Sequence, residues 1–127
     1  MSDMRIAGAA GASPASPEVP PFDVLAAVAE QARRTPGAPA LIDATGQTSY
    51  AELVAEVDRL ADVLTASGVR SGDLVGLCLP RGRAAVTALL AVLRAGAGYV
   101  PLDPGYPAAR LALMLEDTRP RLVLTDA

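Results

Sequence analysis

Few side chains in this sequence are of types that do chemistry, and Cys78 carries the only thiol. A cysteine nucleophile needs an exposed, electropositive site and a neighbouring base. Cys78 instead lies within residues 73–79, a nearly unbroken apolar run, and the chain has no histidine to serve as its base. The sequence therefore predicts a packed thiol. The adjacent acids Glu116 and Asp117 are typical of a solvated helix end rather than of a catalytic carboxylate pair.

Two arginines lie in the segment Pro80-Arg81-Gly82-Arg83, between an apolar run and a helical pattern. Free amides at the start of a helix favour an anion, and a guanidinium group can hold a phosphate through two parallel hydrogen bonds. The segment lacks the glycine-rich loop that encloses a phosphate in nucleotide-binding motifs. We therefore favour a solvated cationic turn, and phosphate binding is the less favoured interpretation.

The glycines Gly96 and Gly98 do not form a dinucleotide-binding fingerprint, because that fingerprint follows a strand and opens a helix. Here the glycines close a helical pattern and precede a strand. They predict a helix C-cap with close packing of helix against strand. The densest local signal is residues 103–107, Asp-Pro-Gly-Tyr-Pro. It predicts a rigid turn in which Asp103 accepts hydrogen bonds from backbone amides.

Composition excludes several classes of function. All 11 cationic side chains are arginine, since the chain has no lysine, and histidine is also absent. Mechanisms that need a histidine base, a lysine Schiff base or a histidine-bound metal are therefore excluded. One cysteine excludes an internal disulfide. The net charge of −3 argues against a nucleic-acid partner. No apolar run reaches the roughly 18 residues of a membrane span, so we expect no membrane partner and a cytoplasmic location.

The elements that must position these side chains alternate along the chain. Apolar residues at helical spacing predict a first helix that Pro36 ends, and a small hairpin follows over residues 40–48. Ser49 and Glu52 have the spacing of a capping box, in which each side chain bonds the other's backbone amide. A second helix is therefore expected to begin there and to end at Gly68.

From residue 73 onwards the pattern is strand, helix, strand, helix, strand. This order predicts an α/β fold whose βαβαβ unit forms a layered parallel sheet with right-handed crossovers. Pro101 places the second strand at an edge or a strand end. The expected strands are residues 73–79, 99–102 and 121–125. The first expected helix covers residues 83–95 and is marked by the apolar residues Val86, Leu89, Leu90 and Leu93. The second begins at Pro107, and its expected inward residues are Leu111, Met114 and Leu115.

Two segments also resemble a known family. Residues 93–111, LRAGAGYVPLDPGYPAARL, closely resemble the second core motif of the adenylation domains of nonribosomal peptide synthetases, L-(K/R)-A-G-x-x-Y-(V/L)-P-(L/I)-D followed by P-x-Y-P-x-x-R. Residues 48–53, TSYAEL, are similar to the first core motif, with Thr48 in place of its leading residue. The resemblance covers about residues 22–127, and two motifs in this order at a fitting spacing are highly specific.

The resemblance implies an acyl-adenylate-forming enzyme. Such domains join an amino acid to ATP with Mg²⁺, release pyrophosphate, and pass the acyl group to the phosphopantetheine thiol of a carrier protein. Their fold has a large N-terminal body of layered α/β subdomains and a mobile C-terminal subdomain. Residues 22–127 resemble the opening part of the large body, and residues 1–21, rich in alanine, glycine, serine and proline, predict a disordered tail. The implied partners are the remainder of the adenylation domain and the carrier protein.

No catalytic, nucleotide-binding or metal-binding residue of the family can be carried over onto this sequence. The phosphate loop with its lysine, the substrate-pocket aspartate, the ribose-binding aspartate and the C-terminal catalytic lysine belong to later motifs that nothing here matches. Tyr99, Asp103 and Arg110 are motif positions whose expected role is to hold the scaffold. We therefore expect the chain alone to bind neither ATP nor Mg²⁺ and to be inactive.

Three interpretations of the chain remain open at this point. The leading one is an N-terminal fragment of an amino-acid-adenylating domain, from a loading module or a stand-alone enzyme. The second is a fragment of a ligase for aryl or fatty acids, although the D-P-x-Y-P-x-x-R continuation favours the peptide-synthetase branch. The third is a truncated, non-catalytic paralogue that acts as an interaction module.

Overall fold

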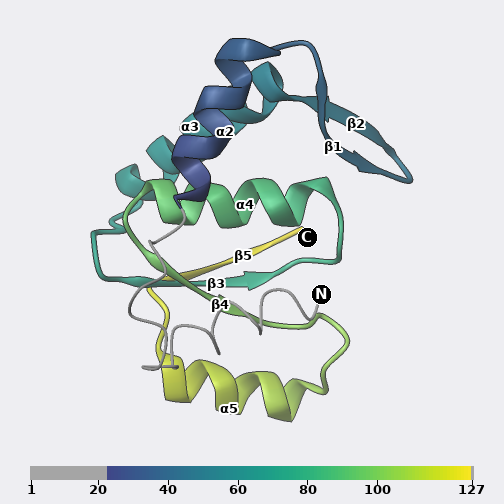
Figure 1. Ribbon diagram of the computed structural model, residues 1–127. Helices are drawn as coiled ribbons and strands as arrows, with labels where there is room; N and C mark the ends of the chain where they lie inside the picture. Colours follow the sequence, from purple (N-terminus) through teal and green to yellow (C-terminus); the bar gives the residue numbers. More distant parts are fainter. Residues whose placement is uncertain (1–22, 127) are drawn as a thin grey trace, which may run out of the picture.

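The computed structural model describes residues 23–126, so the tail predicted over residues 1–21 lies outside the described residues. Two parts follow one another along the chain. The first is a pair of helices joined through a small hairpin, and the second is a three-stranded parallel sheet between two further helices (Figure 1). This arrangement confirms the predicted α/β class and the βαβαβ unit.

The first part begins with helix α2 (Val24–Arg34), capped by Asp23, whose side chain accepts from the Ala26 amide at 3.1 Å. Strands β1 (Pro39–Asp43) and β2 (Gly46–Ser49) then pair antiparallel and form the predicted hairpin. Within the hairpin only Thr48 is buried, and Ile42 is 73% exposed. The hairpin therefore contributes little apolar surface to the core.

Helix α3 (Tyr50–Ala66) begins with the predicted capping box. The Ser49 hydroxyl accepts from the Glu52 amide at 3.1 Å, and the Glu52 carboxylate accepts from the Ser49 amide at 2.8 Å. At the other end Gly68 takes a left-handed conformation (φ 101°). The amide of Val69 then reaches the Leu64 carbonyl at 3.1 Å, which satisfies a carbonyl left free by the helix end.

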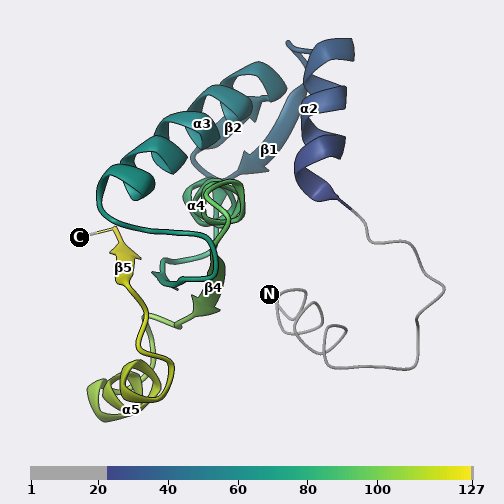
Figure 2. The same cartoon turned by 90° about the vertical axis from the view of Figure 1, so that its left-hand side faces the viewer.

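The sheet has β3 (Leu74–Cys78) at its centre, with β4 (Gly98–Pro101) on one side and β5 (Leu122–Thr125) on the other, all parallel. The edge position of β4 confirms the prediction from Pro101. The chain moves from β3 to one edge and then back past β3 to the other edge. Two crossover connections of the same handedness that run in opposite directions across a sheet place their helices on opposite faces of it. Helices α4 (Arg83–Arg94) and α5 (Ala108–Thr118) accordingly lie on opposite faces of this sheet (Figures 1 and 2).

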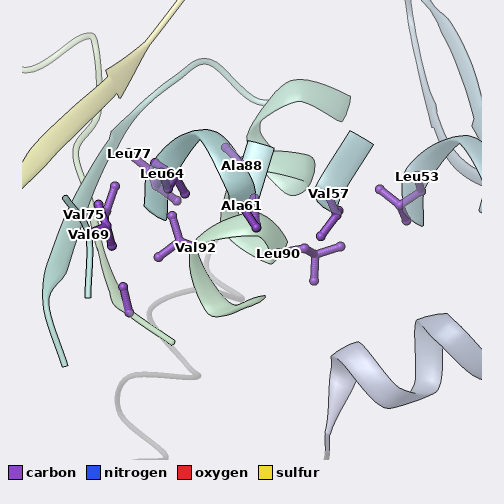
Figure 3. Close-up of a cluster of buried hydrophobic side chains, with 12 residues drawn as sticks. Leu53, Val57, Ala61, Leu64, Val69, Val75, Leu77, Ala88, Leu90 and Val92 are labelled. Atoms are coloured by element: carbon purple, nitrogen blue, oxygen red, sulfur yellow. The ribbon is translucent and has the colours of Figure 1, made fainter. Parts of the chain in front are cut away.

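The buried core lies between α3, α4 and the sheet (Figure 3). The inward face of α4 is rich in small residues, so α3 and α4 pack closely. Of the four residues that marked this helix in the sequence only Leu90 is fully buried, because alanines occupy much of the inward face. The core cluster is Leu53, Val57, Ala61, Leu64, Val69, Val75, Leu77, Ala88, Leu90, Ala91, Val92 and Ala97.

The opposite face of the sheet is much less covered. Helix α5 and strand β5 contain no fully buried residue. The expected inward residues of α5, Leu111, Met114 and Leu115, are half-buried, whereas Leu113 is 61% exposed. Cys78, at the end of β3, is half-buried rather than part of the core cluster. Much of the apolar surface on the α5 side therefore remains open to solvent.

Candidate functional site

An open groove of about 600 Å³ lies between the hairpin, α3 and the turn that leads into α4. It contains Arg81 and Arg83, the two arginines considered above as a phosphate site, and it is therefore the candidate binding site of the chain. Its lining residues are Asp43, Thr45, Thr48, Glu56, Arg59, Leu60, Val63, Pro80, Arg81, Gly82, Arg83, Ala84 and Thr87.

One wall of the groove is built around the carboxylate of Asp43, at the tip of the hairpin. Its Oδ1 accepts hydrogen bonds from the Thr45 hydroxyl at 2.7 Å and from the amides of Thr45 and Gly46 at 2.9 and 3.1 Å. Its Oδ2 accepts from the Arg83 amide at 3.0 Å, 40 residues further along the chain. The carboxylate therefore closes its own turn and also reaches the start of α4.

The guanidinium of Arg83 completes this wall. Its Nε lies 3.1 Å from Asp43 Oδ1, and its terminal nitrogens donate to the hydroxyls of Thr48 and Thr45 at 2.9 and 3.0 Å and to the Gln47 carbonyl at 3.3 Å. All of these acceptors belong to the hairpin. We call the four side chains of Asp43, Thr45, Thr48 and Arg83 the hairpin clamp.

The clamp corrects the sequence interpretation of Arg83. This arginine is not a solvated cation, and it is not free to hold a phosphate through two parallel hydrogen bonds, because hairpin oxygens occupy four of its five N–H donors. Hydrogen bonds from the Thr45 hydroxyl and the Arg83 amide hold the pKa of Asp43 well below its usual range. The clamp therefore stays ionised at neutral pH. Arg81, in contrast, is exposed, as a solvated turn predicts.

The second motif segment forms a compact local structure. Asp103 Oδ1 accepts from the Gly105 amide at 2.8 Å, which confirms the predicted turn. The guanidinium carbon of Arg110 lies 4.3 Å from the centre of the Tyr106 ring, a cation–π contact across the start of α5. Tyr99, on β4, is half-buried against the core cluster. These contacts join the motif to its own helix and strand.

The remaining candidates have structural or surface positions. Gly96 has φ 85°, and the Ala97 amide donates to the Val92 carbonyl at 3.1 Å, so the predicted helix C-cap is confirmed. Glu116 and Asp117 are exposed, as expected of a solvated helix end. Within residues 23–126 no group of three or more acidic, cysteine or histidine side chains could hold a metal ion. No helix among these residues is long and apolar enough to cross a membrane.

The structure is thus a layered α/β unit with an open groove, one wall of which is formed by the paired side chains of Asp43 and Arg83. Comparison with known proteins gives its family. Residues 28–127 match the AMP-binding enzyme family. The chain belongs to that family.

Within the family its relatives are nonribosomal peptide synthetases. The chain is 50% identical over 108 residues to enterobactin synthase component F of Escherichia coli O157:H7, and 44% identical over 97 residues to a dimodular nonribosomal peptide synthase of Bacillus subtilis (strain 168). These matches cover 85% and 76% of this chain but only 8% and 4% of the relatives. The chain thus spans a small part of the synthetases it resembles.

Solved structures agree with this assignment. A four-domain nonribosomal peptide synthetase bound to AMP and glycine matches 84% of this chain with a TM-score of 0.78 and 37% identity, and 8% of that synthetase is covered. VinN in complex with L-aspartate matches 76% of this chain with a TM-score of 0.72 and 32% identity, and 27% of VinN is covered. The fold is therefore that of the N-terminal part of an adenylation domain.

Proposed function

We propose that residues 22–127 form the opening part of an amino-acid-activating adenylation domain. In the complete domain, an amino acid and ATP would give aminoacyl-AMP and pyrophosphate, and the acyl group would pass to the phosphopantetheine thiol of a carrier protein. The observation that carries this proposal is the TM-score of 0.78 to a synthetase bound to AMP and glycine. The two core motifs, at residues 48–53 and 93–111, support the same assignment.

The proposed role of this segment is to build the scaffold rather than to contact the reacting groups. In ATP-dependent sites Mg²⁺ is held by one or two carboxylates together with the phosphates of the nucleotide. Of the two acids that line the groove, Asp43 and Glu56, the first already accepts hydrogen bonds from Thr45 and Arg83. The guanidinium of Arg83 is held by Asp43, so it is not offered to a phosphate. We therefore assign neither nucleotide binding, nor metal binding, nor a catalytic step to these residues.

A chimera tests this proposal. Residues 22–127 replace the matching segment of enterobactin synthase component F, and ATP–pyrophosphate exchange is measured with each amino acid. We expect exchange with the same amino acid as the unmodified parent, because a scaffold segment does not select the substrate. The isolated chain 1–127 should give no exchange above a blank without enzyme.

Two outcomes would contradict the proposal. The first is a chimera that melts as the parent does but catalyses no exchange, since a folded scaffold would then fail to support the reaction. The second is exchange by the isolated chain, which would place catalytic groups within residues 1–127.

A further inference from the structure

The N-terminus of α4 lacks a cap from its neighbouring sequence. Gly82 occupies the N-cap position and has no side chain to accept a hydrogen bond from the first turn. A helix start leaves amide donors without intrahelical partners, and a side-chain oxygen normally satisfies one of them. Here the oxygen comes from Asp43, whose Oδ2 accepts from the Arg83 amide at 3.0 Å.

The turn into α4 is shaped around this carboxylate. A Cβ on Gly82 would lie 3.0 Å from Asp43 Oδ2, and a Cβ on Gly46 would lie 3.3 Å from a terminal nitrogen of Arg83. Both glycines have φ 148°, which L side chains rarely adopt. Glycine at both positions lets the hairpin tip and the start of the helix approach each other closely.

Apolar burial does little to hold the hairpin in place. Its tip carries Ile42, which is 73% exposed, and Leu41 is only half-buried against the core. Three members of the clamp are more enclosed than Ile42, since the side chains of Arg83 and Asp43 are 30% and 23% exposed and Thr48 is buried; the fourth, Thr45, is exposed. The polar contacts between hairpin and α4 are therefore the dense part of this junction.

We propose that Asp43 supplies from the hairpin the capping acceptor that Gly82 lacks at the start of α4, and that the hairpin clamp rather than apolar packing fixes the hairpin to the parallel-sheet unit. Strand-to-helix turns with free amides are sites that bind external anions. In this chain a carboxylate of the protein itself occupies that position. The clamp thus joins two parts of the fold that are distant in sequence and excludes an anion from the turn. This inference is independent of the proposed adenylation reaction.

Chemical rescue provides the test. In the chain with Asp43→Ala, the Arg83 amide and guanidinium lose their carboxylate, and acetate can replace it. We expect Asp43→Ala to lower the melting temperature by several degrees. Acetate should restore part of this loss relative to chloride at equal ionic strength. Acetate should not raise the melting temperature of the parent chain or of the double variant Asp43→Ala/Arg83→Met.

Two further measurements separate the clamp from a general loss of stability. Asp43→Asn retains an N-cap acceptor and should lose less than Asp43→Ala, while Asp117→Ala, at an exposed acid on α5, should change little. Amide hydrogen exchange in Asp43→Ala should increase more at residues 41–48 than at residues 75–77. The single variant Arg83→Met completes a double-mutant cycle with these chains. The proposal is overturned if acetate has no specific effect, if the losses from Asp43→Ala and Arg83→Met add up to the loss of the double variant, or if hairpin exchange is unchanged.

Discussion

Leu64 is the position at which a single truncation should cost the most stability. Its side chain is 1% exposed and lies on α3 against the core cluster (Figure 3). Leu64→Ala removes buried methyl groups and leaves a cavity that the surrounding helices fill only in part. Such changes destabilise proteins by about 2–5 kcal/mol. Small domains have a total stability of about 5–15 kcal/mol, so this loss is a large fraction of the whole.

Urea unfolding followed by far-ultraviolet circular dichroism measures this loss. With an m-value of about 1–3 kcal/mol per molar urea, the midpoint should fall by roughly 1 M or more. The matched control is Leu113→Ala, which makes the same chemical change on α5 at a side chain that is 61% exposed. Its free energy of unfolding should change by no more than about 0.5 kcal/mol.

One outcome of comparing the two variants would contradict this prediction. All chains are measured at one protein concentration, so that association affects them equally. If Leu64→Ala unfolds at the same urea concentration as Leu113→Ala, with an unchanged m-value, the core described between α3, α4 and the sheet does not carry the stability of the chain.

Asp43, Glu52 and Asp73 all have a lowered pKa, mainly because the Thr45 hydroxyl, the Ser49 amide and the Arg70 amide donate to them. As the pH falls, the unfolded chain therefore binds more protons than the folded chain. The free energy of unfolding should be greatest above the ordinary carboxyl pKa and should decline as the pH falls below about 4. A melting temperature that is constant from pH 6 to pH 3 would contradict this. Gly96→Ala should destabilise the chain by roughly 1–2 kcal/mol because φ is 85° there. The control Gly37→Ala, with no atom within 4 Å of the added carbon, should not destabilise it. Equal melting temperatures for the two variants would contradict the helix cap at Gly96. The isolated chain 1–127 should associate, because α5 and β5 contain no buried residue and exposed apolar strands pair between molecules. Light scattering that shows a monomer at every concentration would contradict this.

Features with a local physical cause could be predicted from the sequence. Ser49 and Glu52 are three residues apart, so a capping box needs no knowledge of the rest of the fold. Gly96 and Pro101 act through their own backbone, and the structure places them at a helix end and on an edge strand as expected. The family resemblance was equally local, because each motif is a continuous segment.

The hairpin clamp could not be predicted in this way. Asp43 and Arg83 are 40 residues apart, and nothing in either segment specifies the other. Read alone, Asp43 is a turn residue and Arg83 is a surface cation. Only the packing of the hairpin beside the turn into α4 brings the two charges to 3.1 Å. The alanine-rich face of α4 is equally hard to predict, because hydrophobic periodicity gives most weight to large side chains.

The central position of β3 has a consequence for the chain during its synthesis. β3 is the first strand of the sheet to leave the ribosome, yet its two partners follow much later, β5 after about 50 further residues. At roughly 5–20 residues per second, β5 arrives about 2–10 s after β3. During this interval Val75 and Leu77, both buried in the finished sheet, have no strand on one or both sides. The nascent chain therefore presents an apolar strand to other nascent chains and to chaperones for seconds, whereas α3 and the hairpin can already form from local contacts.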